Sequence, residues 1–297
     1  MPKTSILNHY VKIEQNQEHL VTIIINNYNY GSFLKDAIES VIHQTYKNIE
    51  IIVVDDGSTD NSAEIVQEYA GENLVIPIIK KNGGQISACN AGYKESHGDI
   101  ILFLDSDDVL LEDAVETVVK VWNISNACIQ TQLLICDTNL YPLGGVRPNE
   151  EAIFIPFKEK DMTEISLKNG FYFPALTSGL FLSKSFLQNV MPLPEKHVYI
   201  DNILATLAPL FGTVKTLGKV TGKYRIHQNN YSQNKEKNLA LICTQMYLLK
   251  EQLLNEKIRK FDKKAKILHT YYEYRTILFT SILYPSEFSL LRYHAIR

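Results

Sequence analysis

The chain lacks the features that mark several common protein classes. Its four cysteines form no C-x-x-C pair, which argues against a disulfide framework and against a zinc cage. It contains no run of about 18 apolar residues, and the stretch from Met1 to Leu20 lacks the apolar core of a signal peptide. These absences predict a cytoplasmic protein, with peripheral attachment at the inner face of a membrane as an alternative.

The chain also lacks excess basic charge and the usual phosphate-binding loops. A net charge of −3 and a pI near 6.3 give no reason to expect nucleic-acid binding. Neither G-x-x-x-x-G-K-[ST] nor G-x-G-x-x-G occurs, so an ordinary ATPase and a Rossmann dehydrogenase each lose their main signature. A phosphate-bearing ligand must therefore be held in another way.

Alternating strand-like and helix-like segments dominate the first part of the chain. Strands are predicted at Val21–Ile25, Glu50–Val54, Leu74–Ile79 and Ile100–Leu104, with helices between them. Nearly continuous apolar strands separated by helices indicate an α/β fold whose central sheet is mainly parallel and flanked by helices. Such sheets bind ligands at the carboxyl ends of their strands.

Two of these strands run into clusters of acids. The first cluster is Asp55-Asp56-Gly57-Ser58, and the second is Asp105-Ser106-Asp107-Asp108. Two carboxylates about 4 Å apart repel by roughly 4 kcal/mol at an effective dielectric near 20, so grouped carboxylates must protonate or recruit a cation. Solvated Asp-rich turns are the alternative, but two clusters at equivalent strand ends favour a polar, metal-dependent site. The oxygen ligands of the D-x-D segment suit Mg²⁺ or Mn²⁺.

The texture of the sequence changes after about Ala127. Short strands, prolines and Gly144-Gly145 indicate a loop-rich second half, and helical spacing returns after about Asn230. We therefore expect an N-terminal extension (1–20), a first half of alternating strands and helices (21–120), a loop-rich second half (121–230) and a C-terminal helical extension (231–297).

An ordered series of motifs resembles the nucleotide-binding half of family-2 glycosyltransferases, which share the GT-A fold. The series comprises Val21 to Ile25 with Tyr28-Asn29, Ser40 to Thr45, Val53 to Asp60, Asn82-Gly83-Gly84 with Asn90 and Gly98, and Phe103 to Asp108. A lone D-x-D segment is weak evidence, but this set covers about ninety residues in order. The resemblance implies an inverting, metal-assisted transfer of a sugar from a nucleotide diphosphate to an acceptor hydroxyl.

The resemblance implies that residues 21–120 are the nucleotide-sugar-binding half and residues 121–230 the acceptor-binding half with the catalytic base. It also assigns roles in binding the donor. Asp56, with Asp55 and Tyr28 nearby, would recognise the base, which favours a UDP-sugar. Gly83 and Gly84, beside Asn82, would let the backbone approach the nucleotide, although a plain turn is the alternative. The D-x-D segment would contact the ribose and the metal through Asp105, Ser106, Asp107 and Asp108.

One departure concerns the diphosphate. Many relatives carry a basic residue just before the asparagine equivalent to Asn90, and here Cys89 stands in that place. A diphosphate contact would then come from Lys80, Lys81 or Arg225. A catalytic thiol at Cys89 is the weaker reading, because buried cysteines are usually inert.

The second half must supply the base that accepts the acceptor's proton. Asp201 stands where the family's catalytic acid is expected, before a helix predicted at Ile203 to Phe211, and capping of that helix is its alternative role. The segment from Gly222 to His227 is similar to the family's Y-R-x-H segment, so His227 is predicted to bind metal or phosphate and Arg225 phosphate. Thr177 and Ser178 are weaker candidates for the acceptor site.

The acceptor and the working surface of the tail stay open at this stage. A glycan or a lipid-linked molecule would suit as acceptor. The basic stretch from Lys250 to Lys266 predicts either contact with anionic lipid or, more simply, a solvated face on a packing or dimerising helix. Two other functions are weighed: a sugar-phosphate nucleotidyltransferase, and a non-catalytic protein that binds sugar nucleotides or acts as a scaffold.

Overall fold

A computed structural model describes residues 18–72, 74–148, 159–169, 175–195, 200–228 and 230. The predicted helical extension, including the basic stretch, and nearly all of the predicted N-terminal extension lie outside these residues. Within the described residues, no helix is both long and apolar enough to cross a membrane.

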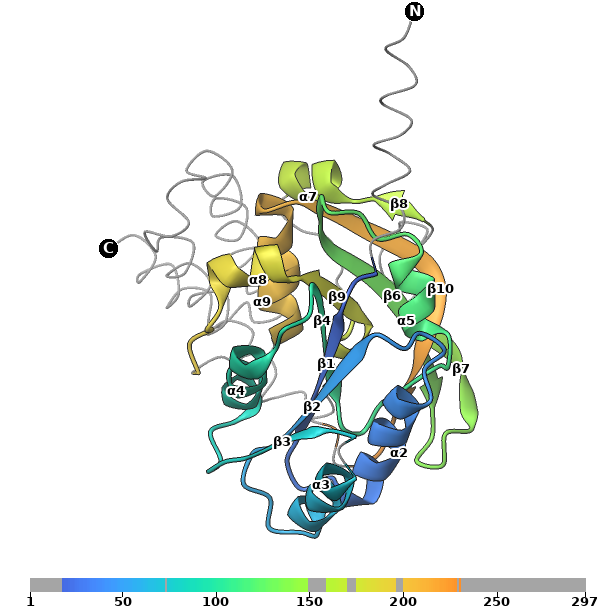
Figure 1. The fold of residues 1–297 in the computed structure, drawn as a ribbon. Coiled ribbons are helices and arrows are strands. Elements are labelled where there is room, and N and C mark those ends of the chain that lie inside the picture. The colour runs from blue at the N-terminus through green and yellow to red at the C-terminus, as the bar shows by residue number, and fades with distance from the viewer. Residues whose placement is uncertain are drawn as a thin grey trace, which may run out of the picture.

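One mixed sheet organises the described residues (Figure 1). Its order is β3-β2-β1-β4-β9-β6-β10-β5, with β7 paired to β6 and β8 paired to β10. The strands are β1 (Val21–Asn27), β2 (Ile49–Asp55), β3 (Ile76–Ile79), β4 (Ile100–Asp105), β5 (Val109–Leu110), β6 (Asn126–Cys136), β7 (Pro142–Arg147), β8 (Lys160–Asp161), β9 (Leu180–Ser183) and β10 (Thr213–Arg225).

Helices cover this sheet. They are α2 (Gly31–Ile42), α3 (Ser62–Gly71), α4 (Gln85–Glu95), α5 (Ala114–Val119), α7 (Thr163–Asn169), α8 (Lys184–Val190) and α9 (Ile200–Leu207), with single 3₁₀ turns η1 (Thr177–Gly179) and η2 (Ala208–Leu210). The predicted α/β fold with helices on a central sheet is confirmed.

The sheet is parallel only in part. Strands β3, β2, β1 and β4 run parallel, as the βα pattern predicts, whereas β9 runs antiparallel to both β4 and β6. Strands from both sides of residue 120 therefore belong to the same sheet. The second half is also less loop-rich than predicted, because β6 and β10 are strands of 11 and 13 residues.

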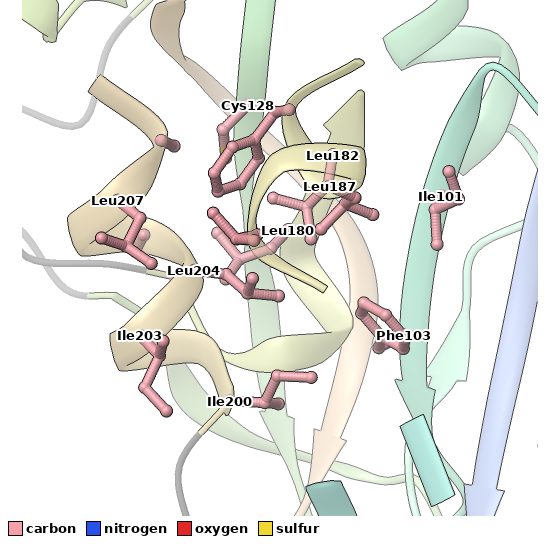
Figure 2. Packing of buried hydrophobic residues seen from close by; sticks show 14 of the residues in the cluster. Ile101, Phe103, Cys128, Leu180, Leu182, Leu187, Ile200, Ile203, Leu204 and Leu207 are labelled. Carbon is pink, nitrogen blue, oxygen red and sulfur yellow. The ribbon is translucent and has the colours of Figure 1, made fainter. Parts of the chain in front are cut away.

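Alternation along β1 divides the core into two clusters. Ile24 points to a cluster shared with α4, α8 and α9, and Ile23 and Ile25 point to a cluster shared with α2, α3 and α5. Figure 2 shows the first cluster, in which Phe103 of β4 and Ile200 of α9 lie among leucines of β9, α8 and α9. Burial on both faces explains why the strands read as continuous apolar runs.

The register of β1 places the acidic clusters. Asn27 pairs with Asp55 of β2, and Asn26 pairs with Asp105 of β4. Because all three strands are parallel, their carboxyl ends meet at one edge of the sheet, with the two asparagines between the two clusters. The fold thus brings together the two acidic segments that are fifty residues apart in the sequence.

Candidate active site

A pocket of about 420 Å³ lies at this edge of the sheet. Four carboxylate side chains line it: Asp56, Asp105, Asp107 and Asp201. Among the described residues, no lysine or arginine contributes to its wall. The other lining residues are Asn26, Asn27, Tyr28, Tyr30, Asn82, Gly84, Gln85, Ala88, Ser106, Leu176, Thr177, Tyr224 and Asn230.

The first acidic cluster divides into a structural acid and a pocket acid. Asp55 is buried and does not line the pocket, and its carboxylate accepts hydrogen bonds from Asn27 Nδ2 at 2.9 Å and from the Ser58 hydroxyl and amide. The turn from Asp55 to Ser58 needs glycine at position 57. Its φ is +75°, and a Cβ at this position would lie only 2.6 Å from Asn82 N. Asp55 therefore shapes the turn that presents Asp56.

Asp56 is held by the loop before α4. Its carboxylate accepts hydrogen bonds from Lys80 Nζ at 2.5 Å, from Gly83 N at 3.0 Å and from Gly84 N at 2.6 Å. Gly83 and Gly84 thus bind Asp56 through their amides, and Lys80, one candidate for the diphosphate, forms an ion pair with it. Lys80 and Lys81 do not line the pocket.

Asp105 ends β4 at the base of the pocket. Its Oδ1 accepts hydrogen bonds from Asn26 Nδ2 at 2.8 Å and from Gln85 Nε2 at 2.9 Å. Burial, followed by the nearby charge of Asp107, raises the pKa of Asp105 to about 7. An uncompensated pair of carboxylates has this effect, and a bound cation would reverse it.

Asp107 and Asp108 face different surroundings. Asp107 lines the pocket, and its Oδ2 lies 3.0 Å from His227 Nε2 and 3.3 Å from Asn230 Nδ2. Asp108 does not line the pocket and accepts hydrogen bonds from Ser178 Oγ at 2.6 Å and from Arg225 N. Burial and the neighbouring acids raise its pKa well above the usual range. Of these two predicted metal ligands, Asp107 lines the pocket and Asp108 does not.

Arg225 is placed against its predicted role. The side chain is 2% exposed, and its N–H groups donate to Asp107 O at 2.8 Å, to Thr138 O and to Asp36 Oδ2 at 2.9 Å. Its guanidinium also stacks 4.6 Å from the centre of the Phe33 ring. These contacts fix the loop that carries Asp107. The guanidinium is occupied by them and does not line the pocket, so its position offers no support for the predicted contact with phosphate.

His227 is buried beside the pocket rather than in its wall. It packs edge-on against Tyr30 and beside Phe33, in addition to its contact with Asp107. Ser178 is likewise buried and donates a hydrogen bond to Asp108, whereas Thr177 lines the pocket. Of the two predicted acceptor residues, only Thr177 is therefore available to a ligand.

Asp201 reaches the same pocket from the second half of the chain. It lies in the first turn of α9, which begins at Ile200 and ends at Leu207, earlier than the predicted helix. Burial raises the pKa of its carboxyl to about 6. A carboxylate with that pKa is a stronger base than an ordinary aspartate, which is the property that a general base needs.

Several pocket residues were missed in the sequence. Asn26, Asn27, Gln85 and Tyr30 line the pocket but were not singled out. A signal for the asparagines was present, since they follow the apolar run Val21 to Ile25 where a buried strand meets its carboxyl end. Among the described residues, Asn27 Oδ1 and Ser106 Oγ are buried without a hydrogen-bond partner in the protein, so each could bond to water or to a polar group of a ligand.

The carboxylate oxygens of Asp105 and Asp107 are suitable ligands for a hard divalent cation. No three His, Cys, Asp or Glu side chains among the described residues form a ready-made ligand set. Mg²⁺ and its relatives are typically bound by one or two carboxylates together with substrate phosphates. The pair therefore matches a metal that arrives with, or is completed by, a phosphorylated ligand.

Cys89 is a core residue. It is fully buried in the cluster between β1 and α4, and burial with the nearby charges of Asp105 and Asp56 raises its thiol pKa well above the usual value. A thiol held in that form is a poor nucleophile. The catalytic reading of Cys89 is thereby excluded on physical grounds.

Comparisons with known proteins agree on one family. The family model described as glycosyl transferase family 2 matches residues 22–181. An uncharacterised glycosyltransferase of Nostoc sp. is 35% identical over 218 residues, which cover 71% of this chain and 66% of the relative. The glycosyltransferase GlyA of Streptococcus pneumoniae is 43% identical over 101 residues, but these cover 34% of this chain and only 14% of GlyA.

Solved structures share the fold. TarS 1–349 of S. aureus, solved in complex with UDP-GlcNAc, superposes with a TM-score of 0.66 at 19% identity, covering 91% of this chain and 75% of that one. The mannosyltransferase PcManGT of Pyrobaculum calidifontis, solved with GDP-Man and Mn²⁺, gives 0.58 at 13% identity, covering 95% and 81%. At these identities the likeness establishes the GT-A-type fold alone.

Proposed function

The chain belongs to glycosyl transferase family 2, and from that membership we propose that it transfers a sugar from a nucleotide diphosphate sugar to an acceptor hydroxyl, with inversion and with help from Mn²⁺ or Mg²⁺. The observation that carries the proposal is the meeting of Asp56, Asp105, Asp107 and Asp201 in one pocket. Asp105 ends β4 and Asp107 lies in the loop that follows it, whereas Asp201 comes from the separate helix α9.

The donor is proposed to bind along the edge formed by β1, β2 and β4. Tyr28 and Asp56 lie at the end suited to the base, and the unpartnered Asn27 Oδ1 and Ser106 Oγ offer bonds to polar groups of the nucleoside. The UDP-GlcNAc and UDP complexes of TarS favour a UDP-sugar, while the GDP-Man complex of PcManGT keeps GDP-sugars as the alternative.

Asp105 and Asp107 are the residues that would hold the cation, with His227 beside Asp107. When bound, a divalent cation neutralises the negative charge of the diphosphate as it leaves the sugar. Asn26 and Gln85 orient Asp105, and Arg225 fixes the backbone of Asp107. The charge arithmetic supports this requirement, because the four pocket carboxylates and the diphosphate are all negative.

Asp201 is proposed as the general base. Its carboxylate accepts the proton of the acceptor hydroxyl, the hydroxyl oxygen forms a bond to the anomeric carbon, and the bond from that carbon to the diphosphate oxygen breaks. A single displacement inverts the anomeric configuration and needs no sugar–enzyme intermediate. Thr177, Tyr224 and Leu176 complete the pocket wall that an acceptor would meet.

The replacement Asp201→Asn tests this assignment against the non-catalytic alternative. We expect donor turnover to fall by at least about a hundredfold, within the range general-base removal produces, while donor affinity changes less than threefold. Release of the nucleoside diphosphate measures turnover, and calorimetric titration measures binding. Full turnover by a folded Asp201→Asn variant would show that another group is the base, and no turnover by the wild-type protein with any donor would favour a binding function.

A further inference from the structure

Asn90, a residue of the family-like motif, does not reach the donor pocket. It lies in the middle of α4 and makes two reciprocal hydrogen bonds with the backbone of Leu193: Nδ2 donates to Leu193 O at 2.7 Å, and Oδ1 accepts from Leu193 N at 2.8 Å. The two bonds imitate the pairing of adjacent strands. Their opposite directions also fix the orientation of the amide, because a flipped amide would face donor with donor.

A second contact joins α4 to the same short segment. Ser87, three residues before Asn90 and therefore on the same side of the helix, donates a hydrogen bond to Glu195 Oε1 at 2.9 Å. Leu193 itself is 2% exposed and packs in the cluster that contains Ile86 and Ala88 of α4. The segment from Met191 to Glu195 is thus fastened to α4 by hydrogen bonds at Leu193 and at Glu195, and the Leu193 side chain is buried in the core.

This segment precedes α9 in the chain, with residues 196–199 between them. The next described residue after Glu195 is Ile200, the first residue of α9, and Asp201 follows it. Figure 2 shows Ile200, Ile203 and Leu204 on α9. These three residues belong to the same core cluster as Leu193. Leu193 therefore stands eight positions before Asp201 in the chain and belongs to the same core cluster as the helix that carries it.

The other end of α4 contacts the donor-binding acids. Gly84, the residue before the helix, donates to Asp56, and Gln85, its first residue, donates to Asp105. One rigid helix consequently touches the donor carboxylates at its start and the segment leading to Asp201 at its middle. General-base catalysis is sensitive to errors of about 1 Å in such a spacing.

We propose that Asn90 is a positioning residue that sets the place of Asp201 relative to the donor by fastening residues 191–195 to α4. This role rests on the proposed function only for its catalytic consequence, since the mechanical link itself is independent of the reaction. Asn90 touches neither donor nor acceptor, and its loss should act on turnover rather than on donor binding.

The experiment compares Asn90→Ala and Ser87→Ala with the control Asn189→Ala. Asn189 is an exposed asparagine on α8 whose amide donates a hydrogen bond to Ser185 O of its own helix, so its removal leaves residues 191–195 fastened. Amide hydrogen exchange is measured on peptides covering residues 191–195, α9 and β1. Turnover and donor affinity are measured with Mn²⁺ and the UDP-sugar that most raises the melting temperature of the wild-type protein.

We expect Asn90→Ala to speed exchange in residues 191–195 and in α9 without speeding it in β1. Turnover should fall at least about tenfold at saturating donor, with donor affinity within about twofold and full binding stoichiometry. Ser87→Ala should give the same pattern at smaller size, and Asn189→Ala should match the wild type. Full stoichiometry separates this outcome from partial unfolding, which would lower the amount of active protein.

Two results would overturn the proposal. Unchanged exchange in α9 would show that the fastening does not govern that helix, and a loss of donor affinity equal to the loss of turnover would show that Asn90 acts on the donor site. Failure of the proposed function has a different signature. In that case the wild-type protein turns over no donor, and the exchange arm alone still decides whether Asn90 fixes α9.

Discussion

At the scale of single residues, the setting of Asp201 predicts the pH dependence of turnover. An ordinary aspartate is ionised above about pH 4, whereas burial raises the pKa of Asp201 to about 6. A base must be deprotonated, so turnover should rise with pH through a midpoint near 6 and fall by about tenfold per pH unit below it. The rate of nucleoside diphosphate release at saturating donor and Mn²⁺, from pH 4.5 to 8.5, measures the midpoint.

The variant Asp201→Asn provides the control for this profile. Its residual rate should lose the midpoint near pH 6, because the titrating group is gone. A wild-type midpoint near 4, or an unchanged midpoint in the variant, would assign the pH dependence to another group.

The same raised pKa has a consequence for stability. Because the carboxyl is harder to ionise in the folded state than in the unfolded state, the raised pKa of Asp201 lowers the free energy of unfolding progressively between about pH 4 and pH 6, and the loss is complete above pH 6. Asp201→Asn should therefore increase the free energy of unfolding at pH 8 by about 1–3 kcal/mol and change it little at about pH 3, where the carboxyl is protonated in both states. Urea unfolding at the two pH values measures the difference, and equal effects at both would contradict the buried setting.

Lys80 is the residue that compensates the charge of Asp56. The Asp56 side chain is 3% exposed and forms its ion pair with Lys80 at 2.5 Å. Removing the Lys80 ammonium leaves the buried Asp56 carboxylate with hydrogen bonds from the amides of Gly83 and Gly84. Lys80→Gln should therefore distort the part of the pocket proposed to bind the nucleobase. We expect donor affinity to fall about tenfold, equivalent to about 1.4 kcal/mol.

Lys81→Gln is the matched control for Lys80→Gln. Lys81 is the next residue and is exposed, so its neutralisation changes the net charge equally without touching Asp56. Calorimetric titration of the two variants with the same donor separates the ion pair from general electrostatics. Equal losses in both variants would remove any special role for Lys80.

At the scale of elements, the approach of α4 to the sheet depends on Gly92. A Cβ at this position would lie 2.3 Å from Ile24 Cγ2 and 3.2 Å from Val54 Cγ2, and both side chains are fully buried. Gly92→Ala should therefore push α4 away from β1 and lower the free energy of unfolding by about 1–3 kcal/mol. Urea unfolding measures this loss.

Gly71→Ala should have the opposite sign. Gly71 ends α3, and a Cβ there meets no atom within 4 Å. Alanine restricts the unfolded chain without a clash, so stability should rise by up to about 1 kcal/mol. Equal effects of the two alanines would mean that the close packing of α4 on β1 is not as the structure has it.

The elements also show which parts of the fold the sequence could predict. The strands around Ile24, Ile52 and Phe103 were predictable because burial on both faces leaves an uninterrupted apolar run. Strands β6 and β10 were not, because they bury polar pairs such as Thr131 and Thr221, whose hydroxyls lie 2.6 Å apart. The register shifts in β10 further break the period of two that marks a strand.

The candidate site was predictable to a similar degree. Strand ends and the D-x-D segment led to Asp56, Asp105 and Asp107, and the resemblance led to Asp201, all of which line the pocket. Which charged residues line the pocket was not predictable. Tertiary hydrogen bonds hold the side chains of Asp55, Asp108 and Arg225 outside the pocket wall. Only the folded chain shows that Arg225 is occupied by Asp36 and by the backbone of Asp107.

At the scale of the whole molecule, the described residues form one sheet of ten strands taken from both sides of residue 120, and the pocket is lined by residues from both sides. Residues before position 120 contribute Asp56, Asp105 and Asp107, and residues after it contribute Asp201. The proposed function predicts from this arrangement that donor affinity and turnover respond to different substitutions.

The central claim is that the pocket binds a nucleotide diphosphate sugar together with a divalent cation. The most direct test is calorimetric titration of UDP-, GDP- and dTDP-sugars into the protein with Mn²⁺ and again with EDTA, for the wild type and for Asp107→Ala. We predict that one donor class binds at least about tenfold more tightly with Mn²⁺ and that Asp107→Ala abolishes this gain. Equal affinity with and without the cation, or a gain that survives in Asp107→Ala, would contradict the account.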